Sequence, residues 1–248
     1  MPKINAGTWK RYDQPFRVFG PLMRVSEIAA QAPQAGFDHY NDRQKAALRK
    51  MADYAYSFLS NPHPDLGREG SVCPFVPTAI RKGLLRATAT SAASVETAEA
   101  AMTAILSVFA AMKPVSPPFG TLVQGDESFK AILIVFPEVS ESAAPQVVDE
   151  LQRRLKPAYV KSGLMIGQFH PTCPDTGLHN PHFRPLQAPV PSLAIRHVTK
   201  FDAPFMDRDE YIDAYLRLFG LEGFRRIHLL EKTRSGNTCP SHLLKSAA

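Results

Sequence analysis

Proline constrains this chain more than any other residue type. The sequence holds 22 prolines, whereas the usual share of about 5% would give about 12, and they cluster at residues 62–77, 114–118 and 171–191. Each proline fixes its own φ angle and restricts the residue before it, so these stretches do not continue a helix or a central strand. We therefore expect ordered, turn-rich connections there, with the regular elements of the fold between them.

Four stretches have the apolar spacing of amphipathic helices. They run from Asp42 to the stop at Asn61-Pro62, over residues 94–112, over residues 143–156, and from Asp207 to the residue before Gly220. The last stretch begins with capping-box spacing between Asp207 and Glu210, and glycine commonly ends a helix.

Strands are expected at residues 84–88, 131–136, 163–169 and 192–198. Residues 131–136 form an unbroken apolar run, which is typical of a central strand buried on both faces. The order strand, helix, strand, helix, strand, strand is typical of ferredoxin-like folds. The sequence therefore predicts an α+β fold, with helices packed on a mixed or antiparallel sheet and with two long proline-rich loops.

The first 41 residues have no clear period and hold Trp9, Pro15, Pro21 and Pro33. We expect an N-terminal arm over residues 1–41, wrapped on the surface of a single domain formed by residues 42–248. The sequence shows no internal repeat and no linker between domains.

Composition narrows the class of protein. A hydrophobic content of 44% is ample for a core, and no apolar run reaches the roughly 18–20 residues that span a bilayer. Three cysteines are too few for a disulfide framework, and the N-terminus lacks the layout of a secretory signal. The net charge of +6 comes from residues spread along the chain rather than from a dense basic run. We expect a cytoplasmic protein that binds neither nucleic acid nor a membrane, and a homodimer stays open.

The first loop, residues 63–77, contains Arg68, Cys73 and Phe75. Pro74 stiffens the turn that presents the sulfur of Cys73, and a rigid thiolate can bind heme iron. The alternative is that Cys73 is a small buried hydrophobic residue. All three cysteines, Cys73, Cys173 and Cys239, precede a proline, and this dipeptide occurs in some heme-regulated proteins.

The second loop, residues 170–191, holds His170, Asp175, His179 and His182. His170 follows a predicted strand and is therefore held more rigidly than the other two histidines, and histidine can be a metal ligand, a general base or a heme ligand. The spacing matches no zinc motif. Solvent-exposed loop residues are the alternative for His179 and His182, and a mononuclear iron site with Asp175 is a further one.

Arg184, Arg196 and His197 lie on or beside the returning strand. A planar guanidinium suits a carboxylate or a heme propionate, although surface charge is the simpler explanation for Arg184. Arg196 and His197 stand in an apolar strand, where an inward charge needs a partner. Glycine-rich nucleotide loops, the nucleophile elbow and kinase signatures are absent from the sequence.

Three strings carry a resemblance: GSVCPFVP at residues 70–77, GLMIGQFHP at 163–171 and NPHFRPLQAPVPSLAIRH at 180–197. Over about residues 45–220 the chain resembles a bacterial family of uncharacterised proteins often encoded beside nonribosomal peptide synthetase genes. Some proteins of this type resemble small heme-dependent enzymes of nitrogen–nitrogen bond formation, including that of the diazeniumdiolate amino acid of certain siderophores. The resemblance implies heme against the sheet, Cys73 or His170 as its axial ligand, and an N-hydroxylated amino acid as substrate.

The leading hypothesis is therefore a heme-dependent tailoring enzyme that acts on a nitrogen centre of a small amino-acid-like substrate in natural-product biosynthesis. Cys73 is preferred over His170 as the iron ligand because its apolar neighbours would exclude water from the bond. Arg68, Phe75 and Arg184 would then contact the heme, and His170, Arg196 and His197 would serve catalysis. The alternatives are a non-heme iron oxygenase built on the second loop and a heme carrier or sensor without catalysis.

Overall fold

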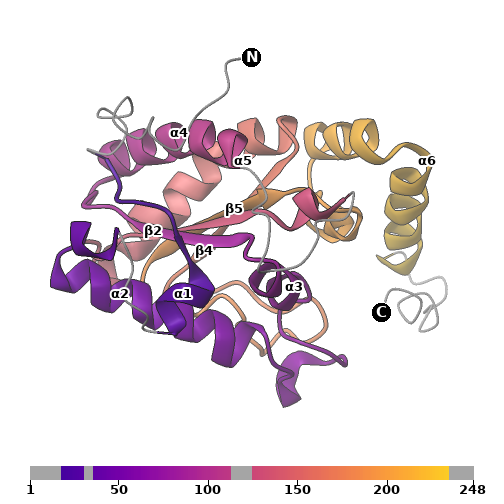
Figure 1. Cartoon of the computed structure of the whole chain (residues 1–248). Coiled ribbons are helices and arrows are strands. Elements are labelled where there is room, and N and C mark those ends of the chain that lie inside the picture. The colour runs from indigo at the N-terminus through magenta and orange to yellow at the C-terminus, as the bar shows by residue number, and fades with distance from the viewer. Residues whose placement is uncertain (1–17, 31–35, 113–124, 235–248) are drawn as a thin grey trace. The chain divides into compact units, whose positions relative to one another are not determined.

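The computed structural model (Figure 1), which describes residues 18–30, 36–112 and 125–234, contains a mixed five-stranded sheet with helices on both of its faces. The predicted α+β class is confirmed. The strands are β1 (Met23–Arg24), β2 (Leu85–Ala89), β3 (Ala131–Val135), β4 (Leu164–Phe169) and β5 (Ser192–His197), and their order in the sheet is β1-β2-β3-β5-β4. β1 is antiparallel to β2, β2 is parallel to β3, and β3 is antiparallel to β5.

The central strand β3 is the apolar run of the sequence, and all five of its residues are buried. Successive side chains of a strand point to opposite faces of its sheet. Leu85, Ala87 and Ala89 of β2, with Leu133 and Val135 of β3, belong to one core cluster with side chains of the first three helices. Ile132 and Ile134 therefore face the other side, and both are fully buried.

The helices are α1 (Val25–Ala29), α2 (Asp42–Asp53), α3 (Phe75–Arg81), α4 (Val95–Ala111), α5 (Glu150–Lys161) and α6 (Asp209–Arg234). In Figure 1, α1, α2 and α3 lie on one side of the sheet, with α4 and the start of α5 on the other. All four helices expected from the sequence are present. The two that were not expected, α1 and α3, have five and seven residues, too few to show a helical period.

Two helices contain wider π-helical turns. The helix α2 continues as the π-helical segment η4 (Tyr54–Leu59), and α5 is preceded by the 3-10 turn η7 (Glu141–Ala143) and the π-helical segment η8 (Pro145–Asp149). Single π-helical turns are rare and frequently lie at functional sites. The sequence pattern predicts neither of these π-helical segments.

Two helices extend beyond their predicted ends. α5 continues through Pro157 to Lys161, because Tyr159 and Val160 in its last turn are buried and their burial offsets the strain of the proline. α6 continues past Gly220, whose φ of 52° and ψ of −130° interrupt the helical backbone before the second half resumes.

The segment expected as an N-terminal arm contributes to the core. Phe19, Met23, Val25 and Ile28 are all buried, and β1 is the strand paired with β2. Trp9 lies outside the described residues.

Contacts divide the chain into two compact units, where the sequence analysis expected one domain after residue 41. Unit 1 comprises Met1–Arg154 and Ile166–Arg196, and unit 2 comprises Leu155–Met165 and His197–Ala248. Unit 2 has a core of its own, formed by Val160, Val198, Ala203, Met206, Tyr211, Ala214 and Tyr215.

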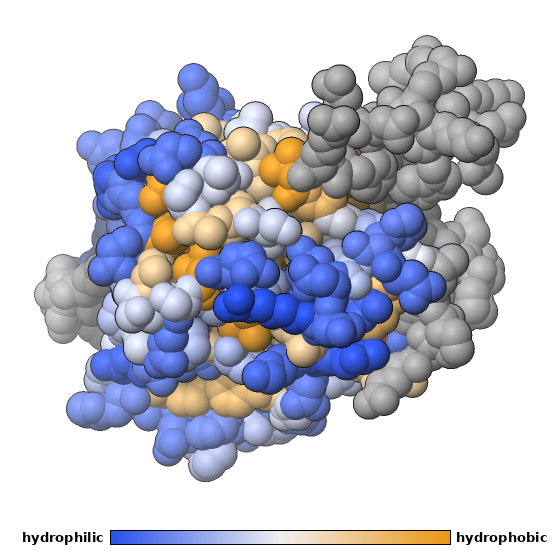
Figure 2. All heavy atoms as spheres, turned by 90° about the vertical axis from the view of Figure 1, so that its left-hand side faces the viewer, coloured by the Kyte–Doolittle hydropathy of each residue, from blue (hydrophilic) through white to orange (hydrophobic). Residues whose placement is uncertain are grey.

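Figure 2 shows one face of the molecule, on which hydrophilic residues predominate and apolar residues form small separate groups. Within the described ranges, no helix has the length and apolar character of a membrane span.

Candidate functional site

The two proline-rich loops meet in unit 1. The Asn180 side chain donates a hydrogen bond to the carbonyl oxygen of Asp65 at 2.8 Å. Gly67 has a φ of +75°, and a Cβ there would lie 3.0 Å from both Cβ and the carbonyl oxygen of His179. Only glycine allows this close approach without strain.

A small apolar cluster holds the loops together. Leu66 and Val72 of the first loop are buried with Phe183 of the second, and Phe58 packs against them. The ring of His63 lies 4.8 Å from that of Phe183, measured between centroids. This histidine therefore has an apolar packing role.

Cys73 lies at the base of the first loop, where the chain enters α3. Its N–H donates to the carbonyl oxygen of Leu59 in η4 at 2.9 Å, and its own carbonyl oxygen accepts from Val76 at 3.2 Å. The backbone therefore fixes the residue on both sides, as expected for a residue before proline. The side chain is only partly buried and packs against the large core cluster.

Tyr54 links Cys73 to the second loop. It is buried at the start of η4, and its hydroxyl donates to the carbonyl oxygen of Pro185 at 2.5 Å. Burial raises the pKa of Tyr54 far above its usual value, and the nearby thiols of Cys73 and Cys173 raise it further. The phenol is therefore a permanent hydrogen-bond donor beside two thiols.

Cys173 differs from Cys73 in being completely buried. The pKa of Cys173 is raised to about 11, chiefly by burial; a backbone hydrogen bond from Asp175 acts against this rise, and the charges of Asp175 and Asp149 add to it. The thiol is therefore protonated at neutral pH, which suits a packed core residue rather than a metal ligand. Cys239 lies outside the described residues.

His170 is also completely buried, and both of its ring nitrogens have partners. Nε2 lies 2.9 Å from Oδ1 of Asp149, and Nδ1 lies 3.1 Å from the hydroxyl of Thr172. Its main chain accepts hydrogen bonds from Cys173 and Ala188 and donates one to Leu186. His170 therefore joins both ends of the second loop to the π-helical segment η8.

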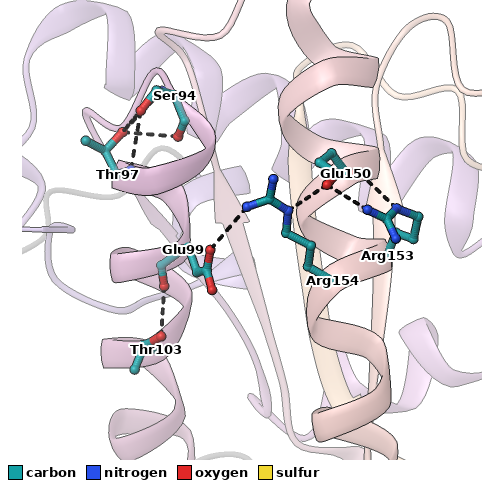
Figure 3. Close-up of polar contacts among 7 residues, drawn as sticks. All are labelled: Ser94, Thr97, Glu99, Thr103, Glu150, Arg153 and Arg154. Carbon is teal, nitrogen blue, oxygen red and sulfur yellow. Dashed lines mark hydrogen bonds and ion pairs between the residues drawn. The ribbon is translucent and has the colours of Figure 1, made fainter.

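Asp149 is the last residue of η8 and lines an open surface depression with Pro145, Gln146, Glu150 and Arg153. Burial raises the pKa of Asp149, His170 lowers it, and Asp175 raises it. Figure 3 shows the next turn, where Arg153 and Arg154 both contact Glu150, at 2.7 and 2.6 Å. Arg154 also reaches Glu99 of α4 at 3.8 Å, so charge pairs join the two helices that cover this face.

Arg68 and Arg184 both stiffen their own loops. Arg68 donates to the carbonyl oxygens of Glu69 and Val72 at 2.8 and 3.0 Å. Burial lowers its pKa, and the neighbouring thiol of Cys73 raises it. Arg184 donates to the carbonyl oxygens of Pro181 and Phe183 at 2.5 and 3.3 Å.

Arg196 and Phe75 lie together on the α3 side of the sheet. The guanidinium of Arg196 is 5.6 Å from the centroid of the Phe75 ring, and that ring is 5.4 Å from the ring of Phe129. His197 follows Arg196 on β5, so its side chain points to the opposite face of the strand. Arg196 and His197 therefore do not face the same region.

The remaining polar residues of the second loop are exposed at its surface. Asp175 accepts a hydrogen bond from Gln168 at 2.7 Å, and the N–H of His182 donates to Asn180 at 2.9 Å. Across residues 18–30, 36–112 and 125–234, no three or more His, Cys, Asp or Glu side chains form a group that could hold a metal ion. The four side chains of the non-heme iron alternative, His170, Asp175, His179 and His182, are all within those ranges.

Tyr54 and Asp149 were missed by the sequence analysis. Each residue lies in a helix that is predicted from the spacing of its apolar residues alone. Each forms a hydrogen bond with a loop residue that is distant in the sequence. Tyr54 lies in the π-helical segment η4 and Asp149 in the π-helical segment η8, and the sequence pattern does not reveal π-helical turns.

Comparison with known protein families gives a match over most of the chain. A family model described as a domain of unknown function (DUF6875) matches residues 48–228. No curated protein and no solved structure is significantly similar to the chain.

Proposed function

The chain belongs to the DUF6875 family, a domain of unknown function, and we propose from its own residues that it binds heme through Cys73. We further propose that it acts on a nitrogen centre of a small amino-acid-like substrate. The observation that carries the proposal is the contrast between its two described thiols: Cys173 is completely buried, whereas Cys73 is held rigidly and keeps part of its surface exposed.

The surroundings of Cys73 fit a thiolate ligand of heme. The side chain packs against the core cluster beside Phe75, and a largely apolar environment strengthens the donation of electron density from sulfur to iron. Arg68 carries a positive charge near the thiol, and Arg196 lies over the ring of Phe75. These cations could pair with heme propionates or with the carboxylate of a substrate.

The contacts of His170 favour Cys73 over it as the ligand. Iron coordination by His170 would require one of its ring nitrogens to leave Asp149 or Thr172, and the ring is fully buried. In the proposed enzyme, His170 holds the second loop in place and the heme supplies the redox-active iron. A heme carrier or sensor without catalysis would use the same ligand.

An absorption spectrum of the protein supplied with heme tests the ligand. We expect a Soret band at roughly stoichiometric loading and a ferrous carbonyl band at the red-shifted position typical of thiolate heme. Cys73→Ala should abolish that red-shifted band, because the iron–sulfur bond is lost. Cys173→Ala is the matched control and should keep it.

Three outcomes would contradict parts of the proposal. A flat visible spectrum rejects heme binding, and a spectrum lost only in His170→Ala would make histidine the ligand. Normal heme binding without turnover of any N-hydroxylated amino acid would favour a carrier over an enzyme.

A further inference from the structure

The surface depression beside Asp149 carries charged groups that the proposed heme site does not use. It is open to solvent, has a volume of about 460 Å³ and is lined by Pro145, Gln146, Asp149, Glu150 and Arg153. These residues come from η8 and the first turn of α5. Sites for small molecules span roughly 300–1,000 Å³, so the depression suits a small ligand.

Asp149 keeps one carboxylate oxygen available at this depression. Its Oδ1 lies 2.9 Å from Nε2 of His170, whereas its Oδ2 has no hydrogen bond or ion pair with any residue that the structure describes. The Asp149 side chain is 30% exposed, and the ring of His170 is fully buried. Since Thr172 holds the other ring nitrogen of His170 at 3.1 Å, the histidine fixes the direction of the carboxylate. Supporting contacts of this kind keep a binding group in one orientation.

The protein compensates the negative charge of Asp149 only in part. Burial raises the pKa of Asp149 despite the opposing effect of His170, and the charge of Asp175 raises it further. A positively charged ligand would offset this cost. A metal ion needs several ligands, and in the described ranges no three or more His, Cys, Asp or Glu side chains form a group that could hold one. An ammonium group, which carries its own N–H donors, suits a single carboxylate oxygen.

Arg153 supplies the opposite charge four residues along the helix, where side chains are neighbours, about 5–6 Å apart at their Cβ atoms. Asp149 and Arg153 nevertheless form no ion pair with each other. Nε and Nη2 of Arg153 donate to Glu150 at 2.9 and 2.7 Å, and Nη1 has no partner among the residues described. Figure 3 shows Arg153 and Arg154 on opposite sides of Glu150. The Arg153 guanidinium therefore keeps one NH₂ group for a ligand.

We propose that this depression binds the zwitterionic head of a small α-amino acid. The ammonium group donates to Oδ2 of Asp149, and the carboxylate accepts from Nη1 of Arg153, so each charge of the ligand meets the opposite charge on the protein. One carbon atom separates the two groups of the ligand, and one helical turn separates the two side chains that contact them. The wider turn of η8 agrees with this role, because π-helical turns are frequent at functional sites.

The proposed amino-acid site is separate from the heme proposed at Cys73. Cys73 packs against the core cluster that includes side chains of α1, α2 and α3, whereas the start of α5 lies on the α4 side of the sheet (Figure 1). Binding of the amino acid therefore needs no heme, and failure of either proposal leaves the other intact.

Two-dimensional NMR titration of the full chain with L-alanine tests the site. We expect saturable shifts of backbone amides in residues 146–154, with a dissociation constant on the order of 1 mM. N-acetyl-L-alanine lacks the ammonium group and L-alanine amide lacks the carboxylate, so each should bind about tenfold more weakly at equal ionic strength. The proposal is overturned if L-alanine causes no saturable shift in these residues, or if either derivative binds as tightly as L-alanine does.

Substitutions test the two anchors separately. Asp149→Asn keeps an oxygen that can accept from His170 but removes the negative charge, so L-alanine should bind about tenfold more weakly. Arg153→Gln should weaken binding about threefold, because the Arg153 side chain is 65% exposed and solvent screens its charge. This exposed position also keeps the test decisive if Asp149→Asn does not fold.

Arg154→Gln is the matched control. Arg154 also contacts Glu150, at 2.6 Å, but does not line the depression, so this variant should bind L-alanine as the wild type does. Wild-type affinity in Asp149→Asn or in Arg153→Gln overturns the proposal, as does an equal loss of affinity in Arg154→Gln.

Discussion

His170 and Asp149 show how one side-chain pair can fix a loop. The sequence predicted that His170 would be rigid because it follows a strand, and the structure agrees. The sequence did not reveal its partner, because Asp149 lies 21 residues earlier in a helix whose apolar residues alone carry the helical pattern. A candidate site residue could therefore be predicted, but its hydrogen bonds depend on tertiary packing.

Ionisation of the Asp149 carboxyl should make the free energy of unfolding depend on pH. Burial raises the pKa of Asp149 above its ordinary value of 3.8, so the folded protein holds this proton more tightly than the unfolded chain does. The stability that this carboxyl contributes is therefore complete below about pH 3.8 and is lost as the pH rises through the folded pKa.

Asp149→Asn tests this sign. The amide oxygen can still accept from Nε2 of His170 but does not titrate. The free energy of unfolding of the variant, relative to the wild type, should therefore increase between pH 3.5 and pH 7 in urea titrations. Asp149→Ala, which leaves a buried nitrogen without its partner, should cost about 1–3 kcal/mol. If the difference in the free energy of unfolding between Asp149→Asn and the wild type does not change with pH, the pKa of Asp149 is not raised in the folded protein.

At the scale of elements, the sequence predicted which helices and strands exist better than where they end. The helix after Asp207 was expected to stop at Gly220, because glycine commonly ends helices. α6 instead resumes after Gly220, since Ile227 and Leu230 of its second half pack against the core of unit 2. The conformational preference of Gly220 explains where the helix is interrupted. The packing of the second half against the core explains why the helix resumes.

Gly220→Ala should therefore destabilise the protein through the backbone alone. Nothing lies within 4 Å of the added Cβ, but a φ of +52° with a ψ of −130° is a conformation that side chains rarely adopt. We expect a loss of about 1–3 kcal/mol in the free energy of unfolding. Gly167→Ala is the control, because its Cβ would meet only Phe169 at an ordinary 3.6 Å. Equal stability of the two variants would mean that the interruption is not strained.

At the scale of the whole molecule, the sheet depends on pairing that no local pattern reveals. The strand β1 has two residues, too few for an alternating pattern, so residues 1–41 seemed to be an arm. β1 nevertheless pairs with β2, and the buried residues around β1 belong to the core of unit 1. The sequence could predict the centre of the sheet, where the apolar runs are long, but not this edge.

A chain that begins at residue 36 tests whether the N-terminal segment is structural. It lacks β1 and α1, and with them the buried side chains of Phe19, Met23, Val25 and Ile28. Burial of each large apolar side chain contributes about 1.5–3 kcal/mol, so the loss would approach the roughly 5–15 kcal/mol of a typical native protein. We expect the shortened chain to lose its cooperative urea transition and its near-UV circular dichroism. In the full chain, Ile28→Ala should cost about 2–5 kcal/mol, whereas Leu178→Ala at an exposed loop position should change stability by less than about 0.5 kcal/mol. A shortened chain that unfolds with the midpoint and steepness of the full chain would show that residues 1–35 are a dispensable arm after all.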